Sequence, residues 1–116
     1  MKKILLPLLF MCAFALNSCS SSSSLYSWYN YEDVTYQYSK KQTDELQAEV
    51  LEQYEKMQNK QKGLRKTVPP GLCAEQGFML CKNGKIEEGI VLLKKEIELY
   101  PESSIYITRI IKQLEK

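Results

Sequence analysis

The chain has 116 residues, a formal net charge of +2 and no histidine. This length suits one small domain, and the lack of histidine removes the commonest general base and metal ligand. The excess charge belongs to Lys2 and Lys3, because residues 19–116 carry 14 basic and 14 acidic side chains. No basic stripe for nucleic acid remains, and we expect no nucleic-acid partner, no metal and no cofactor.

Residues 1–18 are typical of a secretory signal peptide. Lys2 and Lys3 precede an apolar run over residues 4–16, and a short basic start before a brief apolar stretch is the signal pattern. A spanning helix needs roughly 20 apolar residues, and this shorter run also contains Pro7. A cleaved signal therefore fits better than a permanent span.

The tetrad Leu16-Asn17-Ser18-Cys19 resembles a lipobox, the processing site of bacterial lipoproteins. A thiolate is nucleophilic enough to take a diacylglycerol group as a thioether, and Ser18 supplies a small residue before the cut. We expect cleavage before Cys19 and lipid on its sulfur. The alternative is an ordinary cysteine after an ordinary signal.

The lipidated Cys19 and the serines up to Ser24 predict a membrane anchor and a tether for the domain at 25–116. Ser-rich stretches behave as flexible, solvated coil. The residue after Cys19 is not Asp, which in many diderm bacteria allows export to the outer membrane. We expect the protein to lie on the periplasmic face of the outer membrane. The inner membrane and the opposite face of the outer membrane are the alternatives.

Residues 25–40 concentrate large side chains, and helical structure is expected to begin near Tyr31 or Glu32. These side chains either pack on the helices as an N-terminal lid, since tyrosine buries its ring and keeps its hydroxyl near water, or form a stacking surface for sugar or peptide. We favour packing. The candidate partner-binding residues are Tyr26, Trp28, Tyr29 and Tyr31.

A helix is predicted over 43–61, with Thr43 as its N-terminal cap. Its apolar positions recur at helical spacing: Leu46, Val50, Tyr54 and Met57. A loop with Gly63 follows, and its basic residues predict a solvated connection or, alternatively, a contact with anionic headgroups. These are Lys60, Lys62, Arg65 and Lys66.

Three more helices are predicted after the break at 68–71, over 71–82, 86–100 and from about Ser103 to the chain end. Asn83-Gly84 ends the first of these, Pro101 ends the second, and Ser103 or Ser104 is expected to cap the last. The prediction is an all-α fold, a small helical bundle.

Residues 74–101 resemble one degenerate tetratricopeptide-like helix–turn–helix. Gly77 and Gly89 are small where its two helices should cross, and we expect Gly89→Ala to keep the fold and raise the melting temperature because glycine disfavours helix interiors. Cys73 and Cys81 lie eight residues apart in one helix, roughly 12 Å, which is beyond disulfide reach. We expect two buried thiols.

Three longer blocks resemble a family of small bacterial lipoproteins of unknown function. They read LYxWxxYE from Leu25, VPPGLxAExG from Val68 and LYPES from Leu99. The resemblance implies genes beside those of a curli-secretion-type lipoprotein and a second small lipoprotein, and hence other envelope lipoproteins as partners. It carries over no catalytic residue.

Three functions are compatible with these patterns. The first is a non-catalytic protein-binding or assembly component of the cell envelope, which we favour. The second is a purely structural envelope lipoprotein. The third is a cell-wall hydrolase using paired carboxylates, but adjacent acids such as Glu87 and Glu88 point to different sides of a helix. We expect no enzyme.

Overall fold

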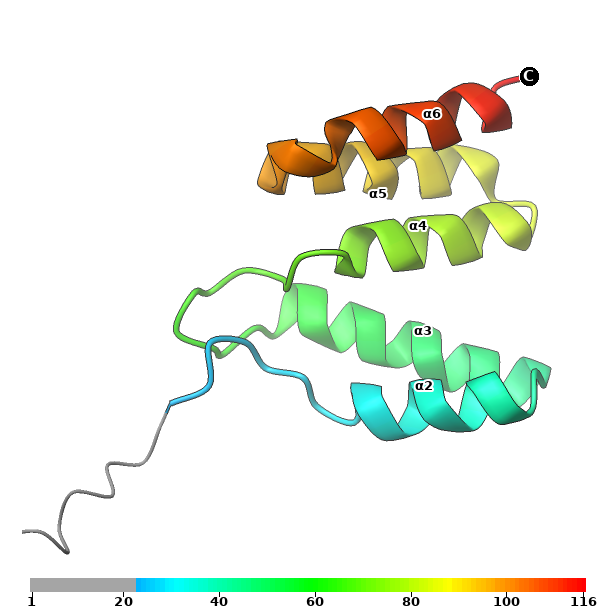
Figure 1. The fold of residues 1–116 in the computed structure, drawn as a ribbon. Coiled ribbons are helices and arrows are strands. Elements are labelled where there is room, and N and C mark those ends of the chain that lie inside the picture. The colour runs from blue at the N-terminus through cyan, green and yellow to red at the C-terminus, as the bar shows by residue number, and fades with distance from the viewer. Residues whose placement is uncertain (1–22) are drawn as a thin grey trace, which may run out of the picture.

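The computed structural model describes residues 23–116, which form five α-helices, one 3-10 turn and no strand. Successive helices run antiparallel (Figure 1). The signal peptide, Cys19 and the first serines lie outside the described residues. The elements are α2 (Tyr31–Lys40), α3 (Asp44–Asn59), α4 (Leu72–Lys82), α5 (Ile86–Leu99), η1 (Pro101–Ser103) and α6 (Ser104–Leu114).

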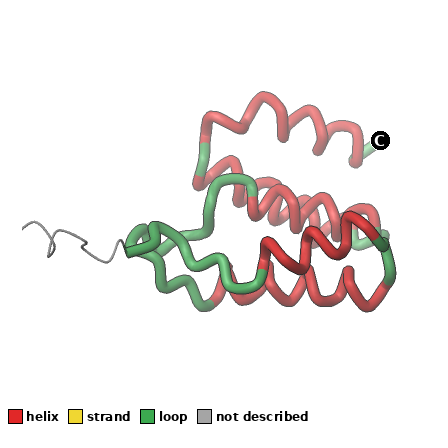
Figure 2. The backbone as a smooth tube through the Cα atoms, turned by 60° about the horizontal axis from the view of Figure 1, so that its bottom comes forward, coloured by secondary structure: helices red, strands yellow, loops and turns green. Residues whose placement is uncertain are grey.

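The antiparallel order gives the bundle two distinct ends. Residues 23–30, the loop over 60–71 and the α5–α6 connection gather at one end (Figures 1 and 2). The α2–α3 turn, the α4–α5 turn and the C-terminus lie at the other. Between the two ends, α4 lies between α3 and α5, and α6 covers the far side of α5. The prediction of an all-α helical bundle is confirmed.

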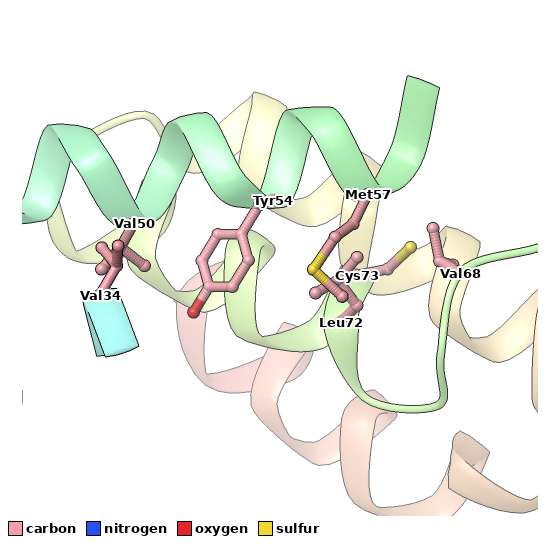
Figure 3. Packing of buried hydrophobic residues seen from close by; sticks show 7 residues of the cluster. All are labelled: Val34, Val50, Tyr54, Met57, Val68, Leu72 and Cys73. Carbon is pink, nitrogen blue, oxygen red and sulfur yellow. The ribbon is translucent and has the colours of Figure 1, made fainter. Parts of the chain in front are cut away.

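Two hydrophobic clusters form the core, and α4 contributes to both. The first joins α2, α3, the loop and the start of α4 (Figure 3), and its buried members are Val34, Val50, Tyr54, Met57, Val68, Leu72 and Cys73. The second joins the end of α4 to α5 and α6 through Cys81, Leu93, Ile107 and Ile111. Cys73 and Cys81 are both free and buried, as predicted.

Most helix boundaries follow from local chemistry. The Thr43 hydroxyl accepts the Leu46 N–H at 3.3 Å, as expected of an N-cap. Gly84 has φ 86°, and the Lys85 N–H reaches the Leu80 carbonyl at 2.9 Å, so α4 ends in a Schellman motif. The predicted serine cap of α6 is wrong, because the Ser103 hydroxyl donates to the Tyr100 carbonyl and α6 has no side-chain cap.

The crossing of α4 and α5 is tighter than the sequence suggested. A Cβ on Gly89 would lie 2.5 Å from the Gly77 carbonyl oxygen and 2.2 Å from the Cys81 sulfur. The helices therefore meet at these two glycines, as predicted. The expectation that Gly89→Ala stabilises the fold is wrong, because the backbone oxygen cannot move aside for a methyl group without shifting a helix.

A buried carboxylate organises the start of α4. Glu96 on α5 is 2% exposed, and it accepts the N–H of Gly71 at 2.6 Å and that of Ala74 at 3.4 Å. Both are first-turn donors that lack a partner inside their own helix. A negative group at this position is also favoured by the helix dipole, so α5 supplies the cap that α4 lacks in its own sequence.

Candidate functional site

The structure places the four predicted partner-binding residues in two adjoining places, which meet where the ring centroids of Trp28 and Tyr31 lie 5.4 Å apart. Tyr31 lies in a groove between α2, α3 and α4. Tyr26, Trp28 and Tyr29 lie at the end of the bundle, beside the loop after α3. The lid interpretation of residues 25–40 holds in part: Val34 is buried and Tyr31 packs on the first cluster, but several large side chains stay exposed, among them Leu25, Trp28, Tyr29 and Tyr36.

The groove is an open hollow of about 280 Å³ with a mixed apolar and polar lining. Phe78 on α4 is 48% exposed at its edge. The helices place their side chains toward one another here because their apolar faces meet in the first cluster below. The lining residues are Tyr31, Thr35 and Tyr38 of α2, Gln42 of the turn, Gln47, Val50 and Tyr54 of α3, and Glu75, Phe78, Met79 and Lys82 of α4.

Glu75 is the polar centre of this groove. Its Oε2 accepts the hydroxyl of Tyr31 at 2.7 Å and that of Tyr54 at 3.1 Å, and Oε1 takes part in neither bond. Burial raises the pKa of both tyrosines above their ordinary value, and the carboxylate raises each pKa further. Both hydroxyls therefore stay protonated and hold the carboxylate as a fixed acceptor facing the groove.

A second polar network closes the groove toward the turn end. The Gln47 amide donates to the Tyr38 hydroxyl at 3.1 Å and accepts from the Asn83 amide at 2.9 Å. This network ties α2, α3 and the end of α4 together. Lys82 also lines the groove. It adds a positive group at the end of α4, whereas Glu75 lies in the first turn of that helix.

The groove offers apolar and hydrogen-bonding groups for recognition, and neither described cysteine lines it. Both thiols are buried outside its lining, and burial raises the pKa of Cys73 to about 11 and also raises that of Cys81. The thiols are therefore protonated at neutral pH. Within residues 23–116 there is also no cluster of three His, Cys, Asp or Glu side chains that could hold a metal ion.

The remaining predicted residues belong to the N-terminal patch, which we define as residues 25–29 and the loop over 60–66. Backbone pairing joins the two segments: the Leu64 N–H reaches the Ser24 carbonyl at 3.1 Å, and the Arg65 N–H reaches the Leu25 carbonyl at 3.1 Å. The Tyr29 hydroxyl donates to the Lys60 carbonyl. A Cβ at Gly63 would overlap the backbone of Leu25 and Tyr26.

Sequence reasoning missed both the pairing in the N-terminal patch and the role of Glu75. Gly63 could have indicated the backbone pairing, because a glycine in a loop can mark a close approach of two backbone segments. No local signal identified Glu75, which meets Tyr31 only after 44 residues of chain have folded back. Within the described residues, no helix is long and apolar enough to cross a membrane.

An all-helical domain with an open tyrosine-lined groove is thus the class of protein that the structure defines. Residues 25–110 match the model of a family described as a domain of unknown function, DUF4810. This match covers most of the chain, and the protein belongs to that family. No curated protein and no solved structure was found to match it.

Proposed function

We propose that this protein is a lipid-anchored, non-catalytic component of the bacterial cell envelope that docks a segment of a partner protein in the groove between α2, α3 and α4. Lipid on Cys19 would hold it at the periplasmic face of the outer membrane. The resemblance to small envelope lipoproteins suggests another lipoprotein as the partner. The observation that carries the proposal is the Glu75 carboxylate, fixed by two tyrosine hydroxyls beside an exposed Phe78.

The groove chemistry suits a segment that carries an apolar side chain next to a basic or amide group. Phe78 and Met79 provide apolar contact area, and aromatic rings are frequent anchors at interfaces. The Oε1 atom of Glu75 offers an acceptor for the basic or amide group. An anchored module also raises the local concentration of both partners on one membrane, so a weak interface suffices.

Site-specific photocrosslinking in intact cells tests this function. A photoreactive amino acid at Phe78 should crosslink one envelope protein, which mass spectrometry of the adduct identifies. The same probe at Tyr106, which is 71% exposed on α6, is the matched control and should not crosslink that protein. Equal crosslinking from both positions, or none from Phe78, would contradict docking in the groove.

A charge variant separates specific recognition from contact by chance. Glu75→Ala should abolish the Phe78 crosslink, whereas Glu98→Ala, an exposed acid on α5, should leave it unchanged. Persistence of the crosslink in Glu75→Ala would show that the carboxylate is not part of the interface. Mass spectrometry of the N-terminal peptide of the same protein tests for acyl chains on Cys19.

A further inference from the structure

We infer that the N-terminal patch is a membrane-seating surface that rests in the headgroup region of a bilayer containing anionic lipid. This inference rests on the proposed lipid anchor at Cys19 and concerns a surface that adjoins the groove where Trp28 packs on Tyr31. It is carried by three properties of the patch: its exposed apolar and aromatic side chains, its unpaired positive charge, and its distance along the chain from Cys19.

The patch exposes large apolar and aromatic side chains side by side. Leu25 is 51% exposed, Trp28 44%, Tyr29 45% and Leu64 63%. The backbone pairing of residues 24–25 with 64–65 brings these side chains onto one surface, and a contiguous exposed apolar patch marks an interaction site. Tryptophan and tyrosine are the side chains enriched where membrane meets water, since each has an apolar body and a polar tip.

The loop that completes the patch carries only positive charge. Lys60, Lys62, Arg65 and Lys66 are all exposed, and residues 60–66 contain no acid. Among residues 23–116, the one ion pair with a nitrogen–oxygen distance below 4.0 Å joins Lys56 to Glu52. None of the four loop cations therefore has a carboxylate partner among the described residues. Basic side chains beside interfacial aromatics are the combination that binds anionic membrane surfaces.

Acidic side chains at this end of the bundle lie on neighbouring elements, outside the patch itself. Glu32 and Asp33 occupy the first turn of α2, and Glu102 lies in η1. The helices elsewhere mix both signs, as in the first turn of α5 with Glu87 and Glu88 beside Lys85. The positive charge of this loop is therefore a local feature, and the net charge of the whole chain does not explain it.

Chain length keeps this end of the bundle close to the bilayer. Ser24 is five residues from Cys19, and an extended chain spans at most about 3.5 Å per residue, so lipid on Cys19 keeps Ser24 within roughly 18 Å of the anchor point. Ser24 pairs directly with the loop of the patch. The α2–α3 turn and the C-terminus lie at the opposite end of the bundle (Figure 1), and the groove stays open to a partner.

The single tryptophan of the chain, Trp28, reports on the patch directly. The mature protein is purified from membranes of a diderm host, its mass is measured, and it is reconstituted into vesicles of phosphatidylcholine with phosphatidylglycerol. A fraction of the lipid carries bromine on its acyl chains close to the headgroup. We expect quenching of Trp28 fluorescence in these vesicles, and much weaker quenching when phosphatidylglycerol is omitted or the salt concentration is high.

Two variants with equal charge change test the role of the loop. Each basic residue near an anionic surface contributes about fivefold to binding, so Lys60→Gln/Lys62→Gln/Arg65→Gln should lower the ratio of seated to unseated molecules roughly 100-fold. The control Lys41→Gln/Lys94→Gln/Lys112→Gln alters exposed positions elsewhere and should quench like the unaltered protein. Circular dichroism checks that both variants fold.

The outcomes separate this inference from the proposed function. An acylated protein whose Trp28 is unquenched in anionic vesicles overturns membrane seating and leaves the anchor intact. A Trp28 signal that changes with protein concentration and not with brominated lipid assigns the patch to contact with a second copy. A protein recovered without acyl chains overturns the anchor and this inference together.

Discussion

Glu96 lies in an environment that its neighbours in the sequence do not suggest. It follows Lys94 and Lys95 in a charged stretch, yet its carboxylate is buried and accepts two backbone N–H groups of α4. A buried carboxylate is tolerated only when hydrogen bonds replace its lost hydration. The residue therefore couples the position of α5 to the start of α4.

Glu96→Ala should lower the free energy of unfolding by roughly 2–4 kcal/mol, because it leaves buried donors without an acceptor. Urea denaturation followed by circular dichroism measures this change. Glu98→Ala, an exposed acid on the same helix, should stay within about 0.5 kcal/mol of the unaltered protein. Equal effects of the two variants would mean that the Glu96 cap contributes nothing.

At the scale of elements, α4 is the helix that joins the two hydrophobic clusters of the bundle. Its start is capped by a residue of α5, its end by the left-handed Gly84, and its middle crosses α5 at Gly77. Its two faces belong to two different hydrophobic clusters. It also carries Glu75 and Phe78, so any shift of α4 moves the wall of the candidate groove.

Gly89→Ala should destabilise the protein by roughly 1–3 kcal/mol, the usual cost of overpacking a close contact. The added methyl group would meet the Gly77 carbonyl and the Cys81 sulfur, and this clash outweighs the better helix propensity of alanine. The melting temperature of Gly89→Ala measures this destabilisation. Glu88→Ala, which alters an exposed neighbour on the same helix, is the control. A melting temperature at or above that of the unaltered protein would show that α4 and α5 lie farther apart.

At the scale of the whole molecule, buried weak acids make stability depend on alkaline pH. The pKa of Cys73 is raised to about 11 by burial, and burial also raises the pKa of Tyr31 and Tyr54. The folded state therefore holds these protons more tightly than the unfolded chain. Their contribution to stability is complete below the unfolded thiol pKa of about 9 and falls as pH rises through the folded values.

We accordingly expect the melting temperature to fall steadily from about pH 9 upward. Differential scanning calorimetry over this range measures the trend. In Cys73→Ala the part of the decline between about pH 9 and pH 11 should shrink, because the titrating thiol is gone, while the decline from the tyrosines remains. A melting temperature that is constant over this range would contradict the burial of these groups.

Sequence alone determined the all-helical class, the order of the helices and most of their ends. The Thr43 cap, the Gly84 stop and the crossing at Gly77 were all predictable. Each depends on side chains within a turn or two, or on a spacing that recurs at the helical period. The burial of Cys73 and Cys81 followed from the same reasoning.

Only the tertiary structure decided what the residues do once the helices meet. It placed Tyr31 against Glu75 and set Trp28 and Tyr29 beside the loop after α3, it buried Glu96, and it left no room beside Gly89. These outcomes depend on contacts between residues that are far apart in the chain. Local periodicity fixes which face of a helix is apolar, but the distance between two packed backbones decides whether a methyl group fits or a carboxylate finds its donors.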